Sequence, residues 1–115
     1  MAETVVSILI ADDHDLVRIG LRHMLADIAD FAVVGEASSG EDALEKSAVL
    51  KPDVVLMDVR MPGIGGIEAT SRMERRSPGS RVIALTACAD DPFPDLLLEA
   101  GARGFLTKDS GFEEL

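Results

Sequence analysis

Five polar residues stand at the ends of short apolar runs in this sequence. Asp12 and Asp13 follow the first run, Asp58 follows a later one, and Thr86 and Lys108 end two more. If these runs are neighbouring strands, three carboxylates and one lysine share a crevice, where two like charges ~4 Å apart repel by several kcal/mol. One lysine cannot neutralise three acids, whereas Mg²⁺ takes oxygen ligands and accepts carboxylates. We therefore predict a magnesium site with Asp13 and Asp58 as ligands and Asp12 at its inner or water-mediated edge.

The same arrangement gives Asp58 a reaction to perform. A carboxylate oxygen left free by the metal can act as a nucleophile toward phosphorus, and phosphoryl transfer depends mainly on in-line placement and charge neutralisation. Lys108 would neutralise one phosphoryl oxygen, and the Thr86 hydroxyl would sense the new group by a hydrogen bond. Each residue also has a plain interpretation: Asp58 as a turn or helix-capping residue, Thr86 as an ordinary strand-end threonine, Lys108 as a surface lysine. Their joint position at the ends of adjacent strands favours a shared site.

Alternating elements must position these residues. Apolar runs predict strands, and the spacing between them predicts helices of roughly 10–15 residues, which is the pattern of βαβ units and a parallel sheet. We expect one doubly wound α/β domain with strand order 2-1-3-4-5 and a crevice at the carboxyl ends of the strands. The expected strands are Val5–Ile10, Ala32–Ala37, Asp53–Asp58, Arg81–Leu85 and Arg103–Leu106. The expected helices are Asp15–Asp27, Gly40–Leu50, one from Ile64 or Gly66 to Arg76, one from about Asp90 to Gly101, and a cut-off first turn at Phe112–Leu115.

The first expected helix carries two apolar stripes. One is wide enough to serve as its core face. The other is not needed by a helix that packs on one side only, so it is either a surface accident or a docking site. The core stripe comprises Val17, Leu21, Met24 and Ile28, and the second stripe comprises Leu16, Ile19 and His23. For the second helix, Ser39 is the predicted N-cap and Pro52 the stop.

Composition narrows the possible functions. The chain has 115 residues, enough for one domain, with a net charge of -10 and no Trp or Tyr. Few aromatics argue against stacking platforms for bases or flavins, and the one basic cluster, Arg72 with Arg75 and Arg76, is better explained as a solvated helix end than as a duplex-binding face. A single cysteine, Cys88, forms no intramolecular disulfide or zinc site alone. With no signal peptide or membrane-length apolar run in the sequence, we expect a soluble, cytoplasmic domain.

Four segments of the sequence resemble the receiver domain of response regulators in two-component signalling. They are Asp12-Asp13, Met57–Gly63, Leu85–Ala87 and Phe105–Lys108, and their order and spacing are specific. Three longer stretches are similar to receivers joined to LuxR-type helix-turn-helix DNA-binding domains: ADDHDLVRIGLRHML, VVGEASSGEDAL and MPGIGGIEAT. The resemblance covers almost all of residues 1–115 and implies a flavodoxin/CheY-like fold.

Roles for individual residues follow from that resemblance. It implies that Asp58 is the phosphoacceptor, supplied by a phosphohistidine on a partner histidine kinase, and that the chain assists its own phosphorylation and dephosphorylation rather than acting as an enzyme. It implies that Mg²⁺ is held by Asp13, Asp58 and the backbone carbonyl of Arg60, with Asp12 assisting. Thr86 and Phe105 would form the switch pair, biased by the local change in charge.

The sequence departs from many receivers in two places. Asp109 stands after Lys108 where those have a proline in a cis peptide, and a cis bond to a non-proline residue costs ~3 kcal/mol. The chain stops at Leu115, early in the expected fifth helix and before any DNA-binding domain, which we interpret as a truncated piece. An uncovered apolar face would favour association, so a homodimer is a further expectation.

Three rival classes fit less well. An aspartyl phosphatase or phosphotransferase of the haloacid dehalogenase type would have an acid two residues after the nucleophile, where this chain has Arg60. A flavin carrier would have a Ser/Thr-rich phosphate loop and stacking aromatics. A degenerate receiver that only pairs with partners would be expected to lack Asp58 or Lys108, and both are present.

Overall fold

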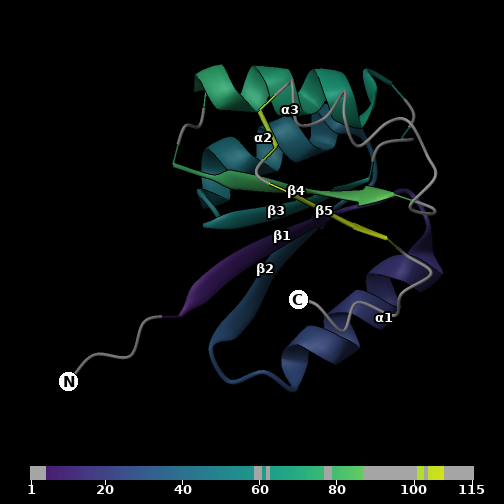
Figure 1. The fold of residues 1–115 in the computed structure, drawn as a ribbon, viewed down its shortest axis with the longest axis vertical. Coiled ribbons are helices and arrows are strands. Elements are labelled where there is room, and N and C mark those ends of the chain that lie inside the picture. Colours follow the sequence, from purple (N-terminus) through teal and green to yellow (C-terminus); the bar gives the residue numbers. More distant parts are fainter. Residues whose placement is uncertain are drawn as a thin grey trace.

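The computed structural model describes residues 5–58, 61, 63–76, 79–86, 101–102 and 104–107, with only the backbone described for residues 86 and 104–107. Within these ranges strands and helices alternate along the chain (Figure 1). The strands are β1 Val6–Ala11, β2 Phe31–Ala37, β3 Val54–Asp58, β4 Arg81–Thr86 and β5 Gly104–Thr107. The helices are α1 Asp15–Ala26, α2 Gly40–Leu50 and α3 Gly65–Arg76.

The five strands form one parallel sheet in the order β2-β1-β3-β4-β5. This is the predicted order, with the chain reversing direction across the sheet between β1 and β3, which makes the carboxyl end of that pair the switch point where such folds bind ligands. The β1–β2 register shifts between Ile8 and Leu9, so Val34 is an extra residue on the edge strand β2. The predicted α/β class and topology are confirmed.

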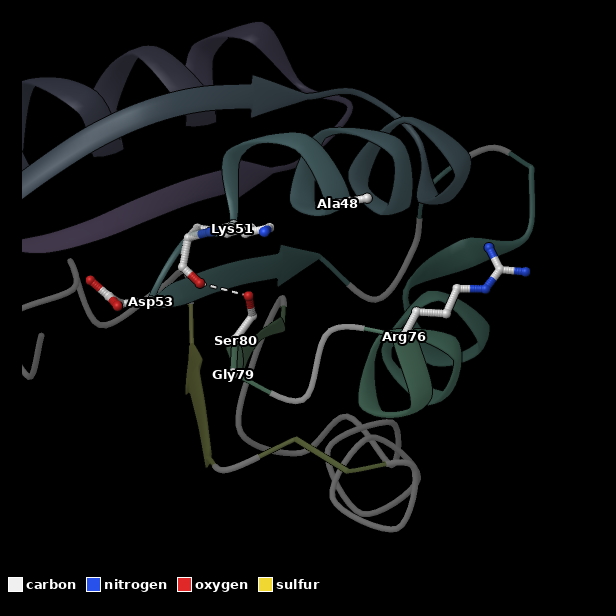
Figure 2. Close-up of a pocket in the computed structure, with 7 residues that line it drawn as sticks. Ala48, Lys51, Asp53, Arg76, Gly79 and Ser80 are labelled. Atoms are coloured by element: carbon white, nitrogen blue, oxygen red, sulfur yellow. Dashed lines mark hydrogen bonds between the residues drawn. The ribbon is translucent and has the colours of Figure 1, made fainter.

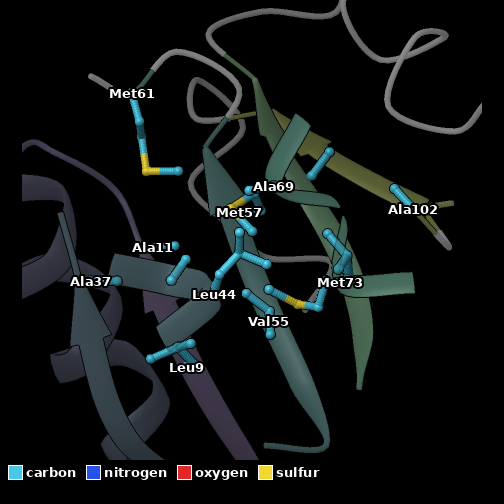
Figure 3. Close-up of a cluster of buried hydrophobic side chains, with 13 residues drawn as sticks. Leu9, Ala11, Ala37, Leu44, Val55, Met57, Met61, Ala69, Met73 and Ala102 are labelled. Carbon is cyan, nitrogen blue, oxygen red and sulfur yellow. The ribbon is translucent and has the colours of Figure 1, made fainter. Parts of the chain in front are cut away.

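Helices cover the two faces of the sheet unequally in the described ranges: α2 and α3 lie on one face and α1 on the other (Figure 1). Successive strand residues alternate between these faces, which separates two buried clusters. Figure 3 shows the cluster beneath α2 and α3, where Leu44 and Met73 from the helices meet Leu9, Val55 and Met57 from the strands. The other cluster joins α1 to the opposite face and contains Ile8, Ile10, Leu21, Leu25, Leu56 and Leu85.

The second helix begins and ends where its sequence predicts. Ser39 is the N-cap, and its hydroxyl accepts a hydrogen bond from the Asp42 backbone N–H at 3.1 Å. Lys51 closes the helix in the left-handed conformation with a φ of 49°, immediately before Pro52. The cap sets the start of α2 just after β2, at the carboxyl end of the sheet.

The core stripe predicted for α1 does face the core, but the prediction omitted one buried residue. Leu21 is fully buried as predicted, and Val17, Met24 and Ile28 pack against the same cluster. Leu25, which was not assigned to the stripe, is also fully buried. The buried line runs through Leu21 and Leu25, four residues apart, with the other apolar residues beside it. The helix expected from Asp90 and the turn expected at Phe112–Leu115 lie outside the described residues.

Candidate functional site

The strand register brings the acidic residues to one end of the sheet. Ala11 on β1 pairs with Met57 on β3, so Asp12 and Asp58 each follow a paired residue on adjacent strands. Asp58 itself is the last residue of β3 and pairs with Leu85 of β4. Asp12, Asp13 and Asp58 therefore lie at the same end of the sheet, as expected.

The cluster is compact and partly buried. Asp12, Asp13, His14 and Asp58 each offer one ligand atom, and these four atoms all lie within 4.8 Å of one another. Asp12 is 0% exposed and Asp58 is 4% exposed, whereas the Asp13 side chain retains 33% of its exposure. Asp12 and Asp58 are therefore buried, and Asp13 is the acid of the cluster that solvent can reach.

The donor set suits a hard cation. At an effective dielectric near 20, two carboxylate charges within the 4.8 Å limit of the cluster repel by about 3 kcal/mol. Carboxylate oxygens are the ligands that Mg²⁺ takes, while Zn²⁺ sites use mainly nitrogen and sulfur. The three acids therefore fit a magnesium ion.

His14 also belongs to the cluster, although it was not selected from the sequence. Its Nδ1 lies 3.2 Å from Asp12 Oδ1 and 3.1 Å from Asp13 Oδ1. Its backbone N–H also donates to Asp12 Oδ1 at 2.8 Å, a turn that orients the buried carboxylate. The available signal was its place immediately after two acids, at the N-cap of α1.

A second group missed at the sequence level lies beneath this turn. The Arg18 Nη1 group donates to the Asp12 carbonyl oxygen at 2.6 Å, and its Nε donates to Glu36 at 3.1 Å. The available signal for this half-buried ion pair was Glu36, a charged residue in the otherwise apolar strand sequence Phe31–Ala37.

The segment after Asp58 is held against the start of α2. Gly63 has a φ of 80° and packs so closely on Glu41 that an ideal Cβ would lie 2.0 Å from the Glu41 Oε1 atom. The same Oε1 accepts a hydrogen bond from the Ile64 N–H at 3.3 Å. The positive φ favours glycine at position 63, whereas the flexible Glu41 side chain could move away from a Cβ.

The remaining predicted site residues are described only in part. Thr86 ends β4 and pairs with Thr107 of β5, so the backbone of Thr86 lies one residue beyond the level of Asp58. Phe105 pairs with Ala84. The other two predicted site residues, Arg60 and Lys108, lie outside the described residues, as does the peptide between Lys108 and Asp109.

The second stripe of α1 faces solvent. Leu16 is 83% exposed and Ile19 is 40% exposed, and His23 is exposed beside them. Packing within the described residues does not explain a leucine and an isoleucine on the outer face of α1, whereas a contact surface for another protein would.

A hollow lies at the opposite end of the sheet. It has a volume of about 490 Å³ and is lined by Ala48, Lys51, Pro52, Asp53, Arg76, Gly79 and Ser80. Figure 2 shows the Arg76 guanidinium extending away from Ser80, whose hydroxyl donates to the Pro52 carbonyl at 2.6 Å. Its position at the amino ends of β3 and β4 is the wrong end for ligand binding in a parallel sheet, so the acidic cluster is the better candidate.

Comparison with known proteins agrees with this fold. Residues 8–115 match the family model of the response regulator receiver domain. The chain is 57% identical over 110 residues to the response regulator GacA of Pseudomonas syringae pv. syringae, covering 96% of this chain and 51% of that protein. It is 46% identical over 110 residues to the response regulator UvrY of Escherichia coli K12, covering 96% of this chain and 50% of that protein. A two-component response regulator of the LuxR family from Aurantimonas sp. superposes with a TM-score of 0.89 at 34% identity, covering 96% of this chain and 80% of that one.

The chain therefore belongs to the response regulator receiver domain family of two-component signalling. It is similar over its length to the receiver parts of GacA and UvrY, and it spans about half the length of the curated relatives it matches. In the described part of the chain, no helix is both long and apolar enough to cross a membrane.

Proposed function

We propose that Asp58 accepts a phosphoryl group from a phosphohistidine of a partner histidine kinase. One carboxylate oxygen of Asp58 attacks phosphorus in line, the phosphorus–nitrogen bond breaks, and the released imidazole nitrogen takes up a proton. The observation that carries this proposal is the packing of Asp58 with two other acids at the carboxyl end of the sheet, all within 4.8 Å. A carboxylate is an established covalent phosphoryl acceptor.

Mg²⁺ fits the cluster, and when bound it would supply charge neutralisation for the acids and for the incoming phosphoryl oxygens. We propose Asp13 and Asp58 as its side-chain ligands and Asp12 as an assisting acid that binds directly or through water. The Arg60 backbone carbonyl is the proposed third protein ligand by analogy with the family.

Further roles are proposed for the two strands beyond Asp58. The Thr86 hydroxyl donates a hydrogen bond to the phosphoryl group, Lys108 neutralises another of its oxygens, and Phe105 changes position together with Thr86. The β4–β5 pairing supports the proximity of Thr86 and Lys108, because it sets residues 86 and 107 side by side at the carboxyl end of the sheet. The same groups assist hydrolysis of the phosphoaspartate, so the chain limits its own active state.

The surroundings of the domain are also proposals. We place it in the cytoplasm and propose that it controls a DNA-binding domain C-terminal to it, through which the whole protein regulates transcription. The length of the relatives, about twice that of this chain, and the similarity to a LuxR-family regulator support this view.

We propose the exposed stripe Leu16, Ile19 and His23 as the surface that contacts the kinase. Exposure of the Leu16 side chain at 83% supports it. A homodimer is the alternative occupant of the α1 face. Replacing Leu16 and Ile19 together by aspartate should slow phosphotransfer from a kinase while labelling by a small phosphodonor stays unchanged. Light scattering at high concentration separates the alternatives: a dimer lost in the same variant would assign the stripe to self-association.

The acceptor proposal is tested by labelling with a small phosphodonor in magnesium buffer. Wild-type protein and the control Asp53→Asn should take up label, since Asp53 lies at the opposite end of β3, whereas Asp58→Asn should take up none. Uptake by Asp58→Asn at the wild-type rate would show that the acceptor is another residue.

A further inference from the structure

Arg18 connects the acidic turn to the edge of the sheet. On the first turn of α1, its Nη1 donates to the Asp12 carbonyl oxygen at 2.6 Å and its Nε donates to Glu36 Oε1 at 3.1 Å. Its Nη2 donates to the Asp15 carboxylate. The Arg18 side chain is only 17% exposed. A planar guanidinium that is bonded at three points has little freedom to move, so it fixes the Asp12 backbone relative to β2.

The residue that anchors Arg18 is itself held by three elements. Glu36 pairs with Ile10 in the β1–β2 ladder. Its second carboxylate oxygen accepts a hydrogen bond from Arg22 Nη1, one turn further along α1. Its backbone carbonyl accepts one from Lys46 Nζ on α2. Glu36, to which the Arg18 guanidinium binds, is therefore held in place by β1, α1 and α2.

The turn between β1 and α1 is fixed on its other sides as well. The Asp12 N–H donates to the Ala37 carbonyl at 2.9 Å, and the Asp12 carboxylate accepts from the His14 N–H at 2.8 Å. Asp13 lies between these two anchored residues. The direction of its carboxylate therefore depends on the peptide that follows Asp12, and the carbonyl oxygen of that peptide is the atom that Arg18 binds.

We infer that Arg18 is a positioning residue for the metal site, acting through the Asp12 carbonyl to aim the Asp12 and Asp13 carboxylates at one ion. The inference rests on the proposed magnesium function. Arg18 has two opposing effects on a cation: its positive charge beside the acids weakens binding, and its hydrogen bonds strengthen binding by holding the turn. The inference is that the second effect is the larger.

The two effects predict opposite signs in a magnesium titration. Arg18→Met removes the charge and the hydrogen bonds, so a purely electrostatic role predicts tighter Mg²⁺ binding. A positioning role predicts binding weaker by about tenfold, the size seen when groups that orient metal ligands are removed. Arg18→Lys keeps the charge but loses the planar fork and should also bind more weakly. Arg72→Met is the matched control, because it removes an equal charge and its ion pair with Glu68 lies within α3, outside the Arg18–Glu36 network.

Mg²⁺ affinity is measured by isothermal titration calorimetry on the whole 115-residue chain, with the His14 amide shift recorded by NMR and thermal unfolding in EDTA as the check of folding. The inference predicts weaker binding in both Arg18 variants, a displaced His14 amide in the metal-free state, and wild-type affinity in Arg72→Met. Glu36→Gln, which leaves Arg18 in place but weakens its anchor, should bind more weakly by a smaller factor and displace the His14 amide. Loss of a negative charge alone would weaken binding without displacing that amide, so the amide shift decides if the Arg18 variants do not fold. Wild-type or tighter binding in a folded Arg18→Met or in Glu36→Gln overturns the inference and leaves the proposed function standing. Absence of binding in the wild-type chain would instead overturn the proposed function.

Discussion

Neutralising one acid of the cluster should stabilise the fold when magnesium is absent. Asp58→Asn keeps the shape of the side chain and removes one charge from a group whose ligand atoms lie within 4.8 Å of one another. Each carboxylate pair at that distance repels by about 3 kcal/mol at an effective dielectric near 20, and solvent at the exposed Asp13 reduces the total. We expect the free energy of unfolding to rise by about 1–2 kcal/mol, which for a domain of this size corresponds to a Tm increase of about 4–8 °C.

Magnesium should reverse that order of stability. A ligand that binds only the folded state at 100 times its Kd adds about 2.7 kcal/mol. The wild-type chain should gain an amount of this order at saturating Mg²⁺, whereas Asp58→Asn, which lacks one ligand, should gain well under 1 kcal/mol by the same relation.

The assay is urea unfolding followed by far-UV circular dichroism, with EDTA and with Mg²⁺, because the chain has no Trp or Tyr for fluorescence. Glu45→Gln, an exposed acid on α2, controls for the change in net charge and should shift neither curve appreciably. A less stable Asp58→Asn in EDTA would contradict the repulsion argument. Equal stabilisation of Asp58→Asn and wild type by Mg²⁺ would contradict its role as a ligand.

Three other predictions concern the framework. Leu25→Ala should lower the free energy of unfolding by about 2–5 kcal/mol in urea titrations, because it leaves a cavity at a fully buried site; a loss below about 1 kcal/mol would show that the α1 packing is wrong. Ser39→Ala should cost about 1 kcal/mol through loss of the α2 cap, and Ser39→Gly should restore most of it, whereas equal losses would argue against capping. The Ser7 backbone N–H, and then its hydroxyl, hold the pKa of the Asp53 carboxyl below its usual value. The stabilising contribution of the Asp53 carboxylate is therefore present above its unfolded-state pKa and is lost as pH falls through the folded-state pKa. The difference in free energy of unfolding between wild type and Asp53→Asn should shrink on acidification. A difference that stays constant with pH would contradict this prediction.

The topology was predictable because hydrophobic patterning and chain direction leave few choices. Apolar runs such as Val54–Met57 are long enough for a strand and too short for a helix, and each is followed by a helical pattern. With right-handed crossovers, that alternation leads to a parallel sheet. The Asp12, Asp13 and Asp58 cluster follows from the same argument, since it needs only the strand order and the residues at the strand ends.

Contacts made through the backbone were not predictable in the same way. Arg18 binds a backbone carbonyl oxygen, and every residue has one. The types of side chain in the sequence therefore do not predict this contact. Leu25 was missed because a periodicity argument gives the direction of an apolar stripe better than its width. The closeness of Gly63 to Glu41 likewise depends on how α2 packs beside the segment after β3.

The most direct test of the central claim is to locate the phosphoryl group chemically. The chain is treated with a small phosphodonor in Mg²⁺ or in EDTA, acyl phosphates are reduced with borohydride, and peptides are sequenced by mass spectrometry. The account predicts homoserine at position 58 with Mg²⁺, little or none in EDTA, and none at Asp12 or Asp13. Homoserine at another acid, or equal conversion of Asp58 in EDTA, would contradict it.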